Sequence, residues 1–276
     1  MEKSLSSLAE SHYENFPVGS FLLRREFREP IRLVYAFARV ADDIADEGND
    51  SKEVRLRSLD AWEGEFRKAI AGNSELPFFQ DLCEAVGKYA IPTSLFFDLI
   101  TAFRMDAVGK EYDTFNDLLL YCRHSANPVG RILLHIFSCT NGETGRLSDS
   151  ICTALQLANF WQDLSVDIER NRVYIPREDF ERFGLRADDL RNGGGTDAIR
   201  ALILFQVERT KKLFLDGKPL FGLIDKRFAL ELRLTYHGGL RITEKVERLG
   251  GSILHQRPVL SRYDWALIAS RSFLAR

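Results

Sequence analysis

The sequence predicts an all-α fold, formed as one domain over residues 1–276. Apolar residues recur at helical spacing along most of the chain, without alternating strand patterns or a low-complexity linker between two halves. Because 45% of the residues are apolar and 28% are charged, the chain can bury a sizeable core and lacks the composition of a disordered protein. All-helical enzymes of this length can form a single unit, so the length does not require a second domain.

The N-terminal part of the chain is expected to form a series of helices. Residues 4–27 have a helical pattern that is interrupted at 16–17. Pro30 is expected in the first turn of the next helix, a position that suits proline. That helix should end at the turn residues 48–50, which also offer an N-cap for the helix that follows. Three further helices are expected over 52–71, 76–89 and 92–107.

The C-terminal part begins with a long helical pattern over 114–139 that contains Pro128. A proline removes a backbone donor, so it should kink or divide this helix and could aim Asn127 inward. One helix is expected over 147–169, and the polar stretch 171–195 is expected to be the least regular part of the chain. Helical periodicity then predicts three more helices over 196–216, 226–249 and 258–273.

Charge and composition exclude several classes of function. The net charge of −2 gives no basic surface for a nucleic acid, so a small molecule or a protein partner fits better. The sequence shows no apolar run of signal-peptide length and no stretch of about 18 uncharged apolar residues, so we expect a cytoplasmic protein. Its four scattered cysteines lack C-x-x-C spacing and are expected to be reduced thiols, namely Cys83, Cys122, Cys139 and Cys152.

Two stretches of the sequence share one arrangement of polar side chains. Their members step by three or four residues, which places each set on one face of a helix. Like charges at i and i+4 destabilise a helix by about 0.2–0.5 kcal/mol per pair, a cost that either solvent or a bound cation could offset. The first set is Tyr35, Arg39, Asp42 and Asp46, and the second is Gln156, Asn159, Asp163 and Asp167.

Repetition of the acidic pattern favours a metal site over a solvated charged face. Carboxylate and amide oxygens suit Mg²⁺, whereas the sequence has no matching histidine or cysteine set for zinc. Two such helices that face each other could hold Mg²⁺ ions bridged by a diphosphate, with Arg39 and Arg172 as additional donors. Because no phosphate-binding glycine loop is present, we expect the diphosphate to leave from carbon, a reaction that needs a dry aromatic pocket.

With these motifs together, nearly the whole chain resembles the squalene/phytoene synthase family, the head-to-head prenyl synthases. The resemblance implies an isoprenoid-synthase helical bundle with a central apolar cavity, in which two aspartate-rich helices face each other and Mg²⁺ assists diphosphate ionisation. The motifs that carry it are His12-Tyr13-x-x-Phe16, Tyr35-x-x-x-Arg39-x-x-Asp42-Asp43-x-x-Asp46, Tyr121 with Asn127-Pro128-Val129-Gly130, and Gln156-x-x-Asn159-x-x-x-Asp163-x-x-x-Asp167 followed by Arg172-x-Tyr174-x-Pro176.

The resemblance also implies roles for individual residues. It implies a group of metal ligands, a group of catalytic residues and a group of substrate contacts, and some residues belong to two of these groups. The metal ligands would be Asp42, Asp46, Asn159, Asp163 and Asp167. The catalytic residues would be Tyr35, Arg39, Tyr121, Asn127 and Arg172, and the substrate contacts would be His12, Phe16, Arg39, Gln156 and Arg172.

Within the family, the wording around 12–18, 41–48 and 159–163 resembles bacterial hydroxysqualene synthases of the hopanoid pathway. Gln162 stands where phytoene and dehydrosqualene synthases usually carry arginine. The resemblance therefore implies Mg²⁺-dependent ionisation of presqualene diphosphate, rearrangement and water capture to give hydroxysqualene, with NADPH not expected. The alternative is a synthase that condenses farnesyl diphosphate to squalene or presqualene diphosphate, or else a phytoene or dehydrosqualene synthase, and a non-catalytic assembly protein on this fold is a remote one.

The expected partners follow from this chemistry. They are a prenyl diphosphate substrate and the sequential enzymes of squalene or hopanoid synthesis, with no nucleic acid. Because substrate and product are very apolar, we also expect a peripheral contact with the inner membrane. The amphipathic C-terminal stretch 265–273 fits such a contact, and it equally fits packing of a helix onto the bundle.

Overall fold

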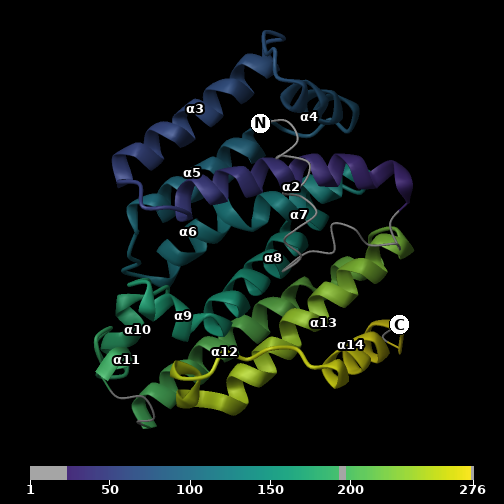
Figure 1. Ribbon diagram of the computed structural model, residues 1–276. Coiled ribbons are helices and arrows are strands. Elements are labelled where there is room, and N and C mark those ends of the chain that lie inside the picture. The colour runs from purple at the N-terminus through teal and green to yellow at the C-terminus, as the bar shows by residue number, and fades with distance from the viewer. Residues whose placement is uncertain (1–23, 193–196, 275–276) are drawn as a thin grey trace.

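The computed structural model describes residues 24–192 and 197–274 (Figure 1). Those residues form α-helices and two short 3₁₀ helices and contain no β-strand, which confirms the all-α prediction. None of their helices is long and apolar enough to pass through a bilayer. The helices are α2 (Arg25–Asp46), α3 (Lys52–Ile70), α4 (Pro77–Lys88), α5 (Ser94–Val108), α6 (Phe115–Ser125), α7 (Asn127–Ile136), α8 (Gly142–Gln162), α9 (Leu164–Glu169), α10 (Arg177–Arg182), α11 (Asp189–Asn192), α12 (Asp197–Gly217), η1 (Lys218–Gly222), α13 (Lys226–Leu249), η2 (Gly250–Leu254) and α14 (Arg262–Leu274).

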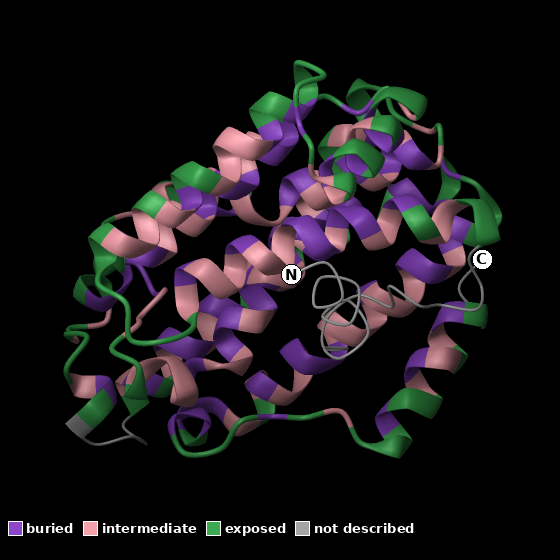
Figure 2. Cartoon of the chain, turned by 45° about the horizontal axis from the view of Figure 1, so that its top comes forward, coloured by how far each residue is buried: buried purple, intermediate pink, exposed green. Residues whose placement is uncertain are grey.

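Helix α8 lies at the centre of the bundle. It packs on α12 and α13 on one side and on α7 and α6 on the other. The N-terminal helices α2 to α5 form the upper part of the molecule in Figure 1, and α12, α13 and α14 form the lower part. Buried residues line the inward sides of these helices and exposed residues follow the outer edge (Figure 2). The two acidic sequence sets therefore lie on helices from different parts of the bundle.

Helix α2 is held by an aromatic core on its apolar face. The ring of Phe37 is fully buried and lies within 5.2 Å, centroid to centroid, of the rings of both Phe66 and Phe96. Trp62 of α3 and Phe79 of α4 complete this cluster. Edge-on and tilted aromatic pairs contribute about 0.5–1.5 kcal/mol each beyond their burial. The opposite face of α2 is thereby fixed in orientation, and that face carries the first acidic set.

Pro30 does not open helix α2, contrary to the prediction. The helix begins at Arg25, so Pro30 lies in its second turn and is buried there. The missing amide of Pro30 would have bonded to the carbonyl of Glu26, four residues earlier. In its place the hydroxyl of Tyr89 donates a hydrogen bond of 3.1 Å to that carbonyl. A tertiary contact thus supplies the donor that the proline lacks.

The helix predicted over 114–139 was expected to be kinked or divided near Pro128, and the structure shows that it is divided. The chain divides at Ala126 into α6 and α7, and Pro128 occupies the first turn of α7, where its missing amide has no helical partner to lose. Asn127 is buried, as expected, and its side-chain oxygen accepts a hydrogen bond of 3.0 Å from Thr153 of α8. This bond fixes the start of α7 against the central helix.

The helix expected over 147–169 begins earlier in the structure and is divided at Asp163, while its end at residue 169 agrees with the prediction. Helix α8 starts at Gly142 because the side chain of Asn141 accepts bonds from the amides of Glu143 and Thr144 in a capping box. It ends at Gln162, and the separate short helix α9 follows Asp163.

Two other boundaries were also predicted imperfectly. The irregular stretch 171–195 contains the short helices α10 and α11. Helix α14 begins four residues later than predicted, at Arg262, because Pro258 lies in the loop before it and Ser261 and Asp264 cap its first turn.

Candidate active site

The two acidic sets are joined by an ion pair between residues 126 positions apart. The guanidinium of Arg172, in the loop after α9, donates two hydrogen bonds to the carboxylate of Asp46 on α2, at 2.7 and 2.6 Å. Such bidentate pairs are the strongest and most directional of the charged contacts. These bonds raise the pKa of Arg172 above its already high value. The contact brings the end of the second acidic set against the first.

A left-handed turn directs Arg172 towards α2. Asn171 has a φ of +57°, a conformation that asparagine tolerates better than most residues, and the amide of Arg172 donates to the carbonyl of Asp167. The chain therefore reverses directly after α9.

The carboxylates of α2 are only partly compensated by positive charge. Arg39 pairs with Asp42 at 3.1 Å, with Asp43 at 2.6 Å and with Glu47 at 3.0 Å, so one guanidinium serves three acids. Burial and the neighbouring charge of Asp46 raise the pKa of Asp42 to about 6. A carboxylate with a raised pKa is stabilised by any cation that binds beside it.

The second set lies at the junction of α8 and α9. Asp163 occupies that junction, and the amide of Asp167 still donates to its carbonyl, so the spacing of one helical turn is kept across the break. Burial, followed by the charge of Asp163, raises the pKa of Asp167 to about 6, and the charge of Asp46 on α2 adds to this shift. The charge of Asp46 on the first set therefore acts on Asp167 at the end of the second set.

A half-buried carboxylate and a wall of aromatic rings lie beside the acidic sets. The hydroxyl of Tyr121 on α6 donates a hydrogen bond of 2.8 Å to Asp106 on α5. Burial raises the pKa of Asp106 to about 7, and the charges of Asp46 and Asp42 also raise it. The ring of Tyr174 stacks on that of Phe160 at 3.8 Å, and Tyr112 lies within 6.1 Å of Tyr174 and 5.8 Å of Tyr121. This wall is apolar, polarisable and buried.

A C-terminal loop brings a further guanidinium to the second set. Arg257, in the loop before α14, donates a short hydrogen bond to the carboxylate of Asp163. The side chain of Gln162, the residue just before, donates a hydrogen bond of 2.9 Å to the carbonyl of Pro258 in the same loop. Gln162 therefore holds the loop that carries Arg257. The side chain at position 162 thus orients the guanidinium of Arg257, whereas an arginine at this position would contribute its own guanidinium.

The other predicted residues have less defined surroundings. Tyr35 lies on α2, and Gln156 and Asn159 lie on α8, two turns and one turn before Asp163 respectively; all three are partly exposed. Asn127 contacts Thr153 of α8, as described above, and is placed by that hydrogen bond at the start of α7. His12 and Phe16 lie outside the described residues, so their predicted role stays a prediction.

The donor chemistry of the two sets fits Mg²⁺. Within residues 24–192 and 197–274, no three acidic, histidine or cysteine side chains converge on one point. Magnesium matches this arrangement, because it usually binds through one or two carboxylates and completes its shell with water and substrate phosphate. The raised pKa values of Asp42 and Asp167 indicate that both sets lack positive charge. Each acidic helix could thus supply one or two ligands.

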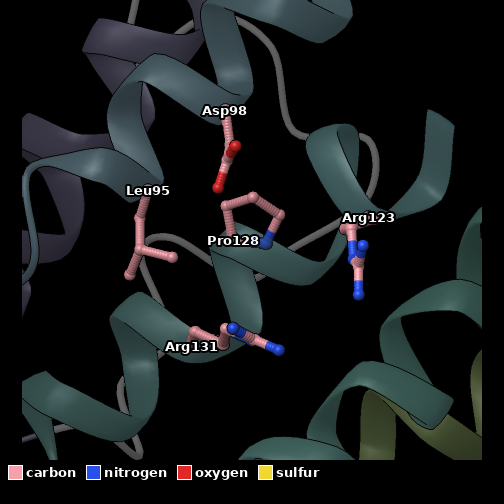
Figure 3. Close-up of a pocket in the computed structure, with 5 residues that line it drawn as sticks. All are labelled: Leu95, Asp98, Arg123, Pro128 and Arg131. Atoms are coloured by element: carbon pink, nitrogen blue, oxygen red, sulfur yellow. The ribbon is translucent and has the colours of Figure 1, made fainter. Parts of the chain in front are cut away.

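A surface pocket lies elsewhere, where α5, α6 and α7 meet. It measures about 190 Å³, less than the roughly 300–1,000 Å³ typical of small-molecule sites. Figure 3 shows the guanidinium groups of two arginines beside the ring of Pro128 and the carboxylate of Asp98. Asp98 is paired with His124 at 2.9 Å and Arg131 is paired with Asp149. We assign this pocket no part in the chemistry. Its lining residues are Leu95, Asp98, Arg123, Pro128 and Arg131.

Three residues of the site were not identified from the sequence. Asp106 and Tyr112 each stand alone in otherwise ordinary helical and loop sequence, so no repeated spacing marks them. Arg257 is 94 positions from Asp163 and lies in an irregular loop. The only available signal was Gln162, whose unusual identity marks the place where the C-terminal loop is attached.

The chain is similar to a known family and to named proteins. A model of the squalene/phytoene synthase family matches residues 9–264. The chain is 34% identical over 268 residues to the hydroxysqualene synthase of Zymomonas mobilis, covering 94% of this chain and 89% of that protein. It is 32% identical over 228 residues to the phytoene synthase of Mycobacterium tuberculosis, covering 81% of this chain and 74% of that protein.

A solved structure has the same fold. The squalene synthase HpnC from Alicyclobacillus acidocaldarius is 42% identical to this chain, with a TM-score of 0.84 and coverage of 90% of this chain and 93% of the solved one. The all-α class expected from the sequence is therefore the class of a solved homologue.

Proposed function

The chain belongs to the squalene/phytoene synthase family, and from this premise we propose that it converts presqualene diphosphate to hydroxysqualene and diphosphate. Enzymes of this family act on prenyl diphosphates. The observation that carries the proposal is the Arg172–Asp46 bridge, which joins two acidic sets beside a buried aromatic wall. The names of the Zymomonas mobilis and Alicyclobacillus acidocaldarius relatives support squalene-type chemistry.

The first step is the departure of diphosphate from carbon. Magnesium, when bound, supplies positive charge that stabilises the leaving diphosphate. Three guanidinium groups, those of Arg39, Arg172 and Arg257, can donate charge-assisted hydrogen bonds to the same oxygens. The residues that would hold the metal are Asp42, Asp46, Asn159, Asp163 and Asp167.

The second step is rearrangement of the carbocation. The rings of Tyr112, Tyr121, Phe160 and Tyr174 offer π-faces that stabilise a cation without reacting with it. Tyr112, Tyr121 and Phe160 are buried, so the wall also keeps bulk water from the cation. Burial raises the pKa of the phenols of Tyr112, Tyr121 and Tyr174, which keeps these hydroxyl groups protonated.

The third step is capture by one water molecule. A new C–O bond forms between the cation and the water oxygen, and the water must lose a proton. The carboxylate of Asp106, with its pKa near 7, is matched to accept that proton, and its hydrogen bond from Tyr121 fixes its position. No hydride donor takes part in this sequence, so NADPH is not required.

The test is an incubation of the purified protein with Mg²⁺ and presqualene diphosphate in the absence of NADPH. Hydroxysqualene and diphosphate should form in equal amounts. The doubly substituted Asp42→Ala, Asp163→Ala protein should be inactive, whereas Asp81→Ala, on the exposed side of α4, should retain full activity. No turnover by the unsubstituted protein, or full turnover by the double variant, would contradict the proposal.

The alternative function is condensation of two farnesyl diphosphates, which the phytoene synthase relative supports. The same incubation started with farnesyl diphosphate distinguishes the two. Accumulation of presqualene diphosphate or dehydrosqualene would identify the chain as a condensing enzyme. Absence of any product from farnesyl diphosphate would place the chain after a separate condensing enzyme.

A further inference from the structure

Helix α14 exposes three aromatic side chains to solvent while it buries two polar ones. Its inward face holds Asp264, Ile268 and Ser272, which are 1%, 0% and 0% exposed. Its outward residues Tyr263, Trp265 and Phe273 are 73%, 55% and 65% exposed. A surface helix normally buries its apolar side and presents its charges to water. Exposed aromatic residues on this scale indicate that the outer face of α14 meets an apolar environment.

The inward polar residues of α14 are fully bonded, so the helix cannot turn its aromatic side inward at low cost. Asp264 accepts hydrogen bonds from Arg241, at 2.6 Å, and from the amide and hydroxyl of Ser261, and it pairs with Lys245 at 2.6 Å. Arg271 pairs with Glu244 of α13. This network fixes the orientation of α14 on α13 and leaves the aromatic residues outside.

The apolar exposure is concentrated in this part of the molecule. Ten large hydrophobic residues are exposed among the described residues, and five of them lie between 259 and 274. Figure 1 shows α14 at the edge of the bundle, against α13 and far from α3 and α4. We call these five residues the α14 patch, and they are Val259, Tyr263, Trp265, Phe273 and Leu274.

The charge of the surrounding segment is strongly positive. Residues 217–274 contain ten basic and five acidic residues, a net charge of +5. The whole chain has a net charge of −2, so the remaining residues together carry −7. On the exposed side of α14 the charged residue is Arg262, while its acid, Asp264, is buried. An anionic partner surface would complement this segment, and the rest of the molecule would be repelled by it.

We propose that the α14 patch docks the protein on the surface of an anionic lipid bilayer. Aromatic and aliphatic side chains at the interface, next to basic residues, are the combination that binds peripheral proteins to anionic lipids. Because five apolar side chains reach outward and the helix is pinned at its polar face, the protein lies on the bilayer without crossing it. The proposal goes beyond the reaction and does not depend on it.

The test is flotation of the full chain with vesicles, in the absence of substrate. Vesicles of equal parts phosphatidylglycerol and phosphatidylcholine should bind the protein, and added salt should weaken this binding. The triple variant Tyr263→Ser, Trp265→Ser, Phe273→Ser should lose about tenfold or more in partition coefficient. Arg262→Glu should lose about tenfold or more on these vesicles, because each basic residue near an anionic surface contributes about fivefold.

Matched controls lie on the far part of the bundle. Ile70→Ser removes a similarly exposed apolar side chain from α3, and Arg57→Glu reverses an exposed charge on the same helix. Both should bind like the unsubstituted protein. Circular dichroism confirms that each variant folds, which is expected because the substituted side chains are largely exposed.

Three results would overturn the proposal. One is equal binding by the triple variant and the unsubstituted protein. Another is equal binding to anionic and to pure phosphatidylcholine vesicles. The third is a concentration-dependent dimer in vesicle-free solution that the triple variant abolishes, since a second copy of the chain would then cover the patch. Loss of enzymatic activity with retained flotation would contradict only the proposed function.

Discussion

Replacement of Arg172 by alanine tests the central contact of the site, because it has opposite effects on stability and on metal binding. The substitution removes two charge-assisted hydrogen bonds to Asp46, each of which contributes about 1.5–3 kcal/mol when fully buried. The two side chains remain 23% and 28% exposed, so solvent screens the pair. We therefore expect the free energy of unfolding to fall by about 1–2 kcal/mol, measured by urea denaturation without divalent cations.

The same substitution frees Asp46 for a cation. If Asp46 is a magnesium ligand, Mg²⁺ must displace Arg172 from it in the unsubstituted protein. Loss of a competitor worth about 1–2 kcal/mol should tighten Mg²⁺ binding by about five- to thirtyfold, measured by calorimetry without substrate. Turnover should nevertheless fall by about tenfold or more, because the diphosphate loses a donor. Arg172→Lys should lie between the two proteins, since lysine keeps the charge but not the bidentate geometry.

The control for this prediction is Arg186→Ala, which removes an exposed arginine from the loop before α11. It should change none of the three measured quantities. Unchanged or weaker Mg²⁺ binding in Arg172→Ala, together with the expected loss of stability, would refute the competition between Arg172 and the cation.

Three further predictions concern pH and individual side chains. Asp42, Asp106 and Asp167 have folded pKa values of about 6, 7 and 6 against an ordinary 3.8, so the folded protein binds more protons than the unfolded one between about pH 4 and 7. Their contribution to the free energy of unfolding should therefore fall as pH rises through this window in the presence of EDTA, measured by urea denaturation. Asp106→Asn should make this decrease smaller. An equal pH dependence of the urea midpoint in Asp106→Asn and the unsubstituted protein would contradict the prediction. Asp264→Ala should cost about 1.5–3 kcal/mol of unfolding free energy, because it removes a buried charge-assisted hydrogen bond from Arg241, which then keeps only Glu244 as its partner. The exposed Ser270→Ala should cost little, and equal urea midpoints for the two variants would exclude the structural role of the network. Tyr121→Phe should remove the hydrogen bond to Asp106, lower stability by about 1 kcal/mol and shift the pH profile of kcat to higher pH, and an unchanged profile would separate Asp106 from the reaction.

The sequence predicted the features that depend on periodic spacing. Apolar periodicity gave the helices, and the stepping of Asp42 and Asp46 and of Asp163 and Asp167 gave the two acidic sets. Local rules were less reliable where a distant residue changes the outcome. Pro30 lies inside α2 because Tyr89, 63 positions away in sequence from Glu26, supplies the missing donor. The break at Asp163 was not predicted, because the residues around it have no helix-breaking composition.

The remaining part of the site depends on contacts between distant segments. Arg257 reaches Asp163 only because the C-terminal loop returns across the end of α8, where Gln162 holds it. Asp106 has a raised pKa only because of its burial near α2, and a fixed position only because of its hydrogen bond from Tyr121. Neither property has a local pattern, so neither could be inferred from spacing.

The pairing of Arg172 with Asp46 and of Arg257 with Asp163 has a consequence for how a charged ligand enters. In the resting protein each of these acids already has an organic cation as its counterion. Under the proposed function, entry of a magnesium diphosphate is an ion exchange: the inorganic cations take over the acids and the displaced guanidinium groups turn to the phosphates. Each of these two guanidinium groups then has an anionic partner throughout loading, and it returns to its carboxylate when the diphosphate leaves with its metal.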